Sequence, residues 1–303
     1  MLEQGKFRIQ VITPVYIGAG DSYKLDKYEM VTDKQELVIL DQAKWALFLR
    51  EKHLFDDYLD FIQKGALSSA PTPKGQQPSK ARFLGEWMQE KNVWKDLPQV
   101  TAYRLPCKFK PVNTLHTFIK NSDGEPYVPG SSIKGVIRSA ILSYLLKNNN
   151  QERQRIKQIL AKILPDIRQI TDRKDKNRIW EQGQKNMALE NLLELLEGPD
   201  HALRSFMRTI RVSDAFLVTS KSPLMICQKV DFNITKGTQS FQKVPLFREC
   251  VREASQFEFS ITFDHSFLKK EDAPFTDLEE LLFLIQEFGK AIQFFNMIDK
   301  EIM

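Results

Sequence analysis

One stretch of the chain combines glycine, hydroxyl and basic side chains in a pattern that suits the binding of a phosphate, and a second stretch offers a glycine turn. In the first, residues 127–138 (YVPGSSIKGVIR), the residue before proline is held extended, Gly130 can turn with positive φ, and a serine can cap a following helix. Free backbone amides at the start of that helix would favour an anion. The side chains expected around the anion are Ser131, Ser132, Lys134 and Arg138, with Gly135 leaving room for it. An ordinary capped helix would use the same residues.

The second stretch, residues 13–21 (TPVYIGAGD), follows a predicted strand. Phe7, Ile9 and Val11 begin an alternation of apolar and polar residues that continues to residue 15 and predicts a half-buried strand. Gly18 and Gly20 would let backbone N–H groups face an incoming group at close range. A tight turn without a ligand is the alternative for this stretch.

The two stretches together resemble a known family. A strand followed by T-P-x-x-I-G-x-G, and much later Y-x-P-G-S-S-I-K-G-x-x-R, is similar to the RAMP superfamily of RNA-binding proteins in CRISPR systems. Residues 25–28 (LDKY) and 247–257 (FRECVREASQF) are most similar to the subunit that caps the crRNA 3′ end in type III-A (Csm) effector complexes. This resemblance implies crRNA and the neighbouring RAMP backbone subunit as partners, and host ribonucleases as further partners.

The chain departs from the family pattern in two ways. RAMP proteins usually carry a glycine-rich loop near the C-terminus, whereas after Gly237 this sequence has only Gly289, inside an apolar helical pattern. Either the chain is shortened or its last strands are absent. The repeated backbone subunit of the same complex cuts target RNA with an aspartate shortly after its glycine turn, where Asp21 or Asp26 stands here. Because the surrounding residues do not match that subunit, we do not carry catalysis over.

Composition favours a globular protein of two domains. The chain has 303 residues, of which 42% are hydrophobic, without an apolar run long enough to span a bilayer. The N-terminal residues lack the basic start and apolar centre of a secretory signal, so we expect a cytoplasmic protein with no membrane partner. Cys107, Cys227 and Cys250 are widely spaced without a C-x-x-C pair, which favours buried thiols over disulfides or a zinc site.

Positive charge is concentrated in one segment. The chain carries a formal net charge of +5, and residues 147–185 alone hold eleven Lys and Arg against five Asp and Glu. An acidic polymer would be attracted to this segment. A solvated helical surface is the alternative, and it is usual for charge runs. In the second half, Lys229 and Lys236 lie in or near a polar loop at residues 233–238 that could lie over an RNA strand.

The pattern of elements predicts an α+β protein. Strands and helices mix in the first part, where residues 28–32 and 36–40, split by residues 33–35, predict a hairpin. Asp41 can cap a helix extending to residue 62 whose aromatic side chains are expected in the core, and residues 65–79 read as a mobile loop. Apolar residues at helical spacing predict further helices over residues 133–144 and 278–295. Pro165 and residues 198–199 are expected to break helices. From residue 209 four strands precede a C-terminal helix. We expect tandem ferredoxin-like (RRM-like) domains, which the RAMP resemblance also implies. Residues 1–207 would form the first domain, with helical insertions at about 41–98 and 148–206, and residues 208–303 the second, which could be incomplete.

Catalytic signatures are missing from the sequence. It contains no H-E-x-x-H, C-x-x-C, G-x-S-x-G or Walker A pattern, and its four histidines are scattered. We therefore predict a non-catalytic crRNA-binding end subunit that acts in crRNA maturation and complex assembly, without a cofactor or metal. One alternative is a divalent-metal endoribonuclease using Asp26, and another is an assembly scaffold without RNA contact. The predicted RNA-binding residues are Gly18, Gly20, Ser131, Ser132, Lys134, Gly135, Arg138, Lys229 and Lys236. We expect the glycine turn and the start of the helix after residue 130 to meet in space around one RNA backbone, without reading its bases.

Overall fold

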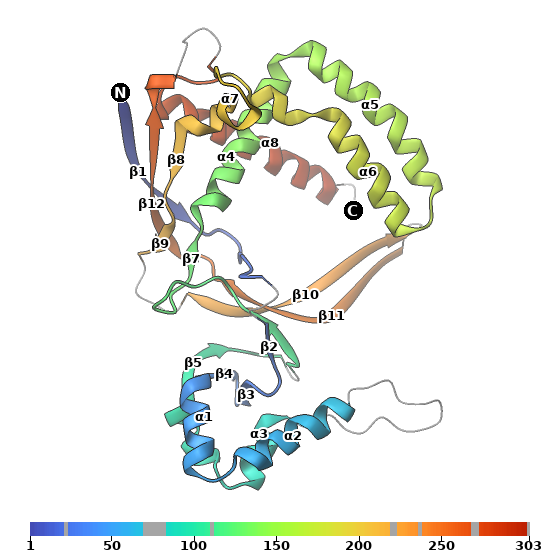
Figure 1. The fold of residues 1–303 in the computed structure, drawn as a ribbon. Coiled ribbons are helices and arrows are strands. Elements are labelled where there is room, and N and C mark those ends of the chain that lie inside the picture. The colour runs from blue at the N-terminus through green and yellow to red at the C-terminus, as the bar shows by residue number, and fades with distance from the viewer. Residues whose placement is uncertain are drawn as a thin grey trace. The chain divides into compact units, whose positions relative to one another are not determined.

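The chain divides into two units, each assembled from separate stretches of sequence (Figure 1). The computed structural model describes residues 1–20, 24–68, 83–109, 112–218, 223–235, 238–267 and 273–301. Unit 1 contains Met1–Arg8, Val128–Phe216 and Glu258–Met303, and unit 2 contains Ile9–Tyr127 and Leu217–Phe257. Both mix helices with sheets, which confirms the α+β class. The division does not follow the expected boundary between residues 207 and 208, because strands from both ends of the chain share one sheet.

That shared sheet is the centre of unit 1. Its strands follow the order β1 (Leu2–Gln10), β12 (Gln256–Asp264), β9 (Ala215–Leu217) and β7 (Tyr127–Val128), and β8 (Ile210–Val212) also pairs with β12. Side chains of β1 alternate between exposed and half-buried along its whole length. The predicted alternation is therefore confirmed, although the strand begins before Phe7 and ends at Gln10.

Two helices, α4 (Gly130–Asn148) and α8 (Leu278–Glu301), lie against this sheet in Figure 1. Apolar side chains of both helices bury against the strands, as their helical spacing requires. The resulting core includes Ile137, Ala140 and Ile141 of α4, Leu281 and Leu284 of α8, and Ile261 and Phe263 of β12. Both helices were predicted from this periodicity.

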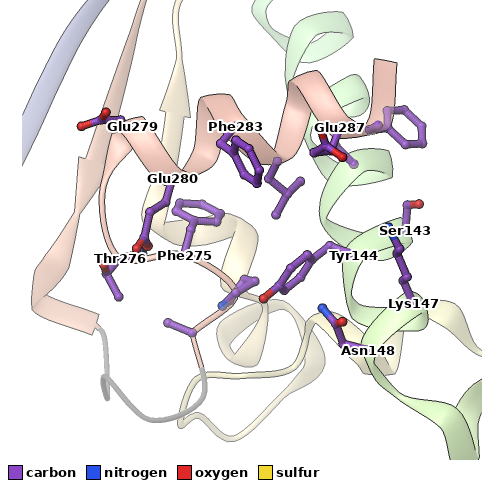
Figure 2. Close-up of a pocket in the computed structure, with 15 residues that line it drawn as sticks. Ser143, Tyr144, Lys147, Asn148, Phe275, Thr276, Glu279, Glu280, Phe283 and Glu287 are labelled. Carbon is purple, nitrogen blue, oxygen red and sulfur yellow. Dashed lines mark hydrogen bonds between the residues drawn. The ribbon is translucent and has the colours of Figure 1, made fainter. Parts of the chain in front are cut away.

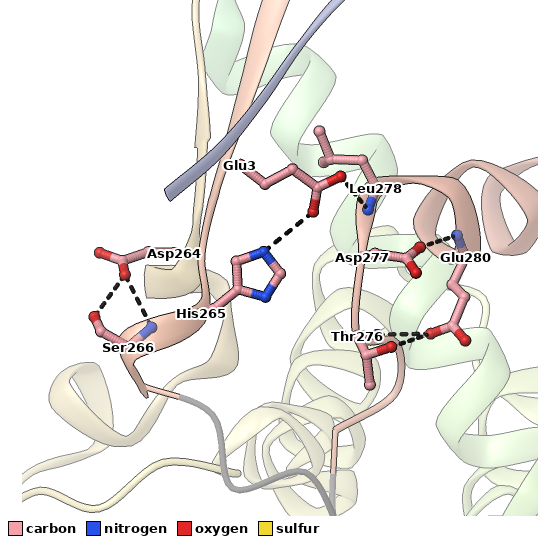
Figure 3. A network of polar contacts seen from close by, with 8 residues as sticks. All are labelled: Glu3, Asp264, His265, Ser266, Thr276, Asp277, Leu278 and Glu280. Carbon is pink, nitrogen blue, oxygen red and sulfur yellow. Dashed lines mark hydrogen bonds and ion pairs between the residues drawn. The ribbon is translucent and has the colours of Figure 1, made fainter. Parts of the chain in front are cut away.

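Polar contacts fix the start of α8 in unit 1 (Figure 3). Glu3 of β1 lies 3.1 Å from the Nε2 atom of His265, and its other oxygen accepts from the Leu278 amide at 3.3 Å. His265 belongs to the turn η5 (His265–Phe267), where Asp264 accepts from both the amide and the hydroxyl of Ser266. A carboxylate at a helix N-terminus stabilises that end. The first turn of α8 is thereby tied to both β1 and β12.

A basic helical hairpin connects α4 to the rest of unit 1. Helices α5 (Asn150–Gln169) and α6 (Arg173–Met187) pack together, and a Cβ at Gly183 would lie 2.5 Å from Ile163. The predicted break at Pro165 is wrong, because α5 continues through it and α6 packs alongside. The short elements η3 (Leu189–Leu193), α7 (His201–Arg204) and η4 (Phe206–Thr209) then lead to β8.

One part of unit 2 packs helices on a small sheet. The antiparallel strands are β3 (Met30–Asp33), β4 (Glu36–Leu40) and β5 (Thr101–Pro106), and the helices are α1 (Gln42–Glu51), α2 (Phe55–Ser68), α3 (Leu84–Glu90) and η2 (Trp94–Val100). The predicted hairpin and the Asp41 cap, which accepts from the Lys44 amide at 3.0 Å, are confirmed. The long predicted helix is interrupted at His53, whose φ is 57°. The aromatic side chains form a core, as expected.

The other sheet of unit 2 carries a long hairpin. Its order is β10 (Leu224–Thr235), β11 (Thr238–Val251), β6 (Thr114–His116) and β2 (Lys24–Asp26). The predicted loop at residues 233–238 is mostly strand, since Thr235 pairs with Thr238, and Lys236 lies outside the described residues. Residues 69–79 of the predicted mobile loop also lie outside them, and residues 65–68 end α2.

Candidate RNA-binding surface

The start of α4 differs from the predicted anion site. Pro129, not a serine, is the residue preceding the helix, and no side-chain cap is formed. The amides of Ser132 and Ile133 donate to the Pro129 carbonyl at 2.9 and 3.3 Å. Gly130 is helical rather than turned with positive φ, and a Cβ there would lie 2.5 Å from the Val212 carbonyl oxygen. The predicted serine cap is therefore wrong, and the glycine serves close packing instead.

An aspartate of the protein occupies the position expected for a phosphate. Asp214, between β8 and β9, accepts from the Gly130 amide at 2.7 Å. Its carboxylate satisfies one free N–H group at the helix N-terminus and complements the helix dipole. Because Asp214 is acidic, it opposes a second anion at this point. No local pattern predicted this contact, because Asp214 lies far from Gly130 along the chain.

The basic side chains of α4 already have partners. The Lys134 ammonium donates to the Ile210 carbonyl at 2.8 Å, and partial burial lowers the pKa of this lysine. Arg138 forms an ion pair with Glu190. Ser131, Ser132 and Gly135 are exposed, and a Cβ at Gly135 would meet no atom within 4 Å. RNA could therefore approach Gly135 closely. Lys134 and Arg138, in contrast, would have to give up their present partners to bind RNA.

The glycine turn lies in unit 2, beside β6. Gly18 pairs with Phe118 in an isolated bridge, two residues after β6 ends. Gly20 is exposed with φ of 96°, a conformation that strongly favours glycine. Gly18, Gly20 and the exposed Lys229 thus belong to unit 2, whereas the five predicted residues of α4 belong to unit 1. The predicted meeting of the two groups stays a prediction.

A row of basic side chains that was not predicted from the sequence crosses the β10–β11–β6–β2 sheet of unit 2. Lys24 of β2 is the register partner of His116 on β6, and His116 is the partner of Arg248 on β11. Register partners on adjacent strands point to the same face, so the three side chains stand side by side across three strands. Lys24 is exposed and the other two are half-buried. We call Lys24, His116 and Arg248 the basic row.

Tyr16 extends the basic row with an aromatic ring. The Arg248 guanidinium lies 4.8 Å from the centroid of the Tyr16 ring, a cation–π contact. A Cβ at Gly18 would lie 2.6 Å from the Tyr16 hydroxyl oxygen, so the glycine leaves space for this ring. The Nε atom of Arg248 is buried with no hydrogen-bond partner among the described residues. Both Tyr16 and Arg248 lie in stretches that carry the family resemblance, which is the signal that could have pointed to them.

A buried ion pair supports the sheet. Glu249 is fully buried, accepts from the Phe118 amide at 2.9 Å and lies 2.8 Å from the Lys120 ammonium. Lys120 also donates to the Tyr103 hydroxyl at 2.6 Å, and burial, followed by the charge of Glu249, raises the pKa of Tyr103. Hydrogen bonds on both sides keep the buried carboxylate paired. This network joins β11, the end of β6 and β5.

Asp26 and Glu29, the described acidic residues near the glycine turn, do not form a recognisable metal site with other described residues. Asp26 accepts from the Tyr28 amide at 2.7 Å, and Glu29 accepts from the Asp26 amide at 3.0 Å. Burial raises the pKa of Glu29. Asp21 lies outside the described residues. Across the part of the chain that the structure describes, no group of three or more His, Cys, Asp or Glu could hold a metal ion.

The basic segment of residues 147–185 forms the helices α5 and α6. Helix α5 has no buried side chain. Arg155 nevertheless has a structural role, because it donates to the carbonyls of Asn186 and Met187 at 3.1 and 2.6 Å, at the end of α6. In the described ranges, no helix is both long and apolar enough to cross a bilayer.

The sequence of the chain is similar to those of known proteins. A family model described as RAMP superfamily matches residues 8–297. The CRISPR system Cms protein Csm5 of Mycobacterium tuberculosis is 24% identical over 271 residues, which cover 88% of this chain and 68% of that protein. The protein of the same name from Streptococcus thermophilus is 24% identical over 299 residues, covering 96% and 69%.

A solved structure has a similar fold. One chain in the cryo-EM structure of a Csm–crRNA–target RNA ternary complex of a type III-A CRISPR-Cas system gives a TM-score of 0.63. The identity is 21%, and the match covers 98% of this chain and 78% of that one.

Proposed function

Because the chain belongs to the RAMP superfamily, we propose that it is the crRNA-binding subunit that caps the 3′ end of the guide in a type III-A CRISPR effector complex. The relatives from M. tuberculosis and S. thermophilus bear the name Csm5, and the similar solved structure is that of a Csm complex with crRNA and target RNA. Both findings support a subunit of this kind of complex. Its role would be binding rather than catalysis.

The basic row beside Tyr16 is the observation that carries the RNA-binding proposal. Lys24 and Arg248 provide cations on the two strands that flank β6, with His116 between them, and the Tyr16 ring provides a surface against which a base can stack. Contacts to phosphate and to a base face do not read sequence, as a guide with a variable spacer requires.

The predicted residues would add to this surface. In unit 2, Gly18 and Gly20 would bring backbone amides close to the RNA, and Lys229 would add charge along β10. Lys236, which lies outside the described residues, would contribute a further charge. In unit 1, the exposed Ser131, Ser132 and Gly135 would form a second contact. Lys134 and Arg138 would take part in it by exchanging their present partners. This second contact is the weaker one, because Asp214 already occupies the helix start.

We propose that the chain forms a tandem of two ferredoxin-like domains. In unit 1 the elements β1, α4, β9, β12 and α8 follow one another along the chain, and the third strand, β12, lies between the first and second in the sheet. A ferredoxin-like β-α-β-β-α arrangement has this connectivity. Unit 2 would contain the other domain with the insertion at residues 41–98, while the insertion at 148–206 belongs to unit 1.

The proposed role defines the partners and the place of action. The subunit would pack on the neighbouring RAMP backbone subunit, protect the crRNA 3′ end during trimming, and meet host ribonucleases there, in the cytoplasm. The rival ribonuclease activity has a simple test, in which labelled RNA is incubated with the protein and Mg²⁺ or Mn²⁺. Cleavage that is lost in Asp26→Asn would establish that activity.

The RNA-binding proposal is tested by a salt series. Fluorescence anisotropy with a short labelled single-stranded RNA would compare wild type with the double variant Lys24→Gln and Arg248→Gln. We expect affinity to fall about tenfold or more, and the slope of log K against log salt to flatten by about 1.4 for two lost phosphate contacts. The control pair Arg8→Gln and Lys44→Gln removes the same charge from exposed ion pairs elsewhere. Equal affinity and slope in both variants would contradict the proposal.

A further inference from the structure

A long groove separates α4 from α8 in unit 1 (Figure 2). Its volume is about 800 Å³. Apolar and aromatic side chains form most of its surface, and Figure 2 shows Tyr144 extending from α4 towards Phe275. The apolar lining residues are Ala140, Tyr144, Phe275, Phe283, Leu284 and Phe288.

Helix α8 exposes one aromatic ring outside its core-facing stripe. Leu281 is fully buried in the core of unit 1, whereas Phe283 is 64% exposed at the groove. Tyr144, on the opposite helix, is 41% exposed. A helix that is apolar beyond its core-facing stripe is usually covered on the second face as well. Exposed aromatic rings that share one groove mark an interaction site more often than scattered apolar residues do.

The shape of the groove fits an extended partner. Its α8 side runs from Thr276 in the preceding turn to Phe288, and the helical part from Leu278 to Phe288 spans about 15 Å at the rise of an α-helix. Its α4 side runs from Ala140 to Asn148. An apolar groove between two helices, about three helical turns long, is a usual binding site for a third, amphipathic helix.

The charge of the groove selects the kind of helix. Glu279, Glu280 and Glu287 line the α8 side, against Lys147 on α4. A hydrogen bond from Lys290 lowers the pKa of Glu287, so this carboxylate is ionised at neutral pH. With Lys147 and Lys290 set against the three glutamates, the groove keeps a net charge of −1 in a chain with a net charge of +5, and Glu280 already accepts from the Thr276 amide and hydroxyl. Carboxylates repel phosphates and attract Lys and Arg, which favours a basic protein segment over RNA.

We propose that the α4–α8 groove docks an amphipathic helix of a partner protein, with the apolar face of that helix against Phe283 and Tyr144 and its Lys or Arg residues beside the three glutamates. This docking surface lies within unit 1 and does not depend on RNA binding by the basic row. It would connect the subunit to another protein while RNA is bound elsewhere.

The probe for this proposal is a labelled helical peptide of Leu and Lys in amphipathic order, titrated against the full chain by anisotropy. We expect Phe283→Ser to weaken binding about tenfold, the loss typical of an aromatic anchor. Glu279→Gln should weaken it less, and more so at low salt. Phe216→Ser, which removes another exposed ring of unit 1, is the matched control and should leave affinity unchanged.

Four outcomes would overturn the proposal. Phe283→Ser could bind the Leu/Lys peptide as wild type does, or a Leu/Glu peptide of the same pattern could bind equally well. Single-stranded RNA could displace the peptide from wild type but lose affinity in Phe283→Ser, which would assign the groove to RNA. Light scattering could instead show a dimer that Phe283→Ser dissociates, which would assign it to a second copy of the chain.

Discussion

The ring of Tyr16 lies 4.8 Å from the guanidinium of Arg248. The contact joins the glycine-turn stretch to β11, two parts of the sequence that carry the family resemblance separately. Gly18 makes it possible, because a Cβ there would lie 2.6 Å from the Tyr16 hydroxyl oxygen. Gly18 therefore leaves the space that the Tyr16 ring occupies, in addition to the close approach of RNA to the Gly18 backbone that we propose.

Gly18→Ala should displace Tyr16 from Arg248. The added methyl group overlaps the end of a side chain that can move, so we expect little loss of stability but a reduction in RNA affinity about as large as that of Tyr16→Ala, roughly five- to tenfold for one lost stacking contact. Anisotropy with single-stranded RNA measures both variants. Wild-type affinity in Gly18→Ala together with weak binding in Tyr16→Ala would show that Gly18 does not position the ring.

Gly130→Ala and Gly135→Ala should have opposite effects on stability. A Cβ at Gly130 meets the Val212 carbonyl oxygen at 2.5 Å, and overpacking of this kind costs about 1–3 kcal/mol. At Gly135 the same Cβ meets nothing within 4 Å, and an alanine inside a helix should stabilise by about 0.5–1 kcal/mol. Urea unfolding monitored by circular dichroism compares them. A destabilised Gly135→Ala, or a neutral Gly130→Ala, would contradict the described start of α4.

Lys120→Ala should destabilise the protein strongly. It leaves Glu249 buried without its cation, and breaking a buried pair from one side costs about 3–5 kcal/mol. The control Lys64→Ala removes an exposed pair with Asp60 and should change the free energy of unfolding by less than about 1 kcal/mol. Equal unfolding midpoints in urea for the two variants would refute a buried role for Lys120.

Cys250 should resist alkylation in the folded protein at pH 8. Burial, together with neighbouring Cys227, raises the pKa of the Cys250 thiol to about 12, so the reactive thiolate is scarce at that pH. Its reaction should become faster as the pH rises towards this pKa, or when urea unfolds the chain. Mass spectrometry after a timed iodoacetamide pulse gives the modified fraction. Rapid modification of Cys250 at pH 8 without denaturant would contradict the burial of β11.

Local features of the fold could be predicted from the sequence, and long-range ones could not. The turn at residues 33–35 and the Asp41 cap depend on neighbours along the chain, and both are confirmed. The break between α1 and α2 was missed, because His53 adopts φ of 57° without a glycine or proline to signal it. The pairing of β1 with β12 joins the two ends of the chain, which no local pattern encodes.

In the candidate site, too, some features could be predicted from the sequence and others depend on contacts between distant residues. The match of the family model over residues 8–297 confirms the resemblance that the two glycine motifs predicted. The serine cap was wrong because Asp214, distant in sequence, supplies the carboxylate at the start of α4. The basic row was missed because it depends on the register of β2, β6 and β11. Strand register is set by pairing partners, which a single sequence does not reveal.

Capping of the guide is tested most directly by crosslinking within the assembled effector complex. A photoreactive 4-thiouridine at the 3′-terminal nucleotide of the crRNA would be irradiated, and the attached peptides identified by mass spectrometry. Capping predicts crosslinks to peptides of this chain containing Tyr16 or Arg248, reduced when Lys24→Gln and Arg248→Gln are combined. Crosslinks from the 3′ end to other subunits alone, or to this chain only from a 5′-terminal probe, would contradict it.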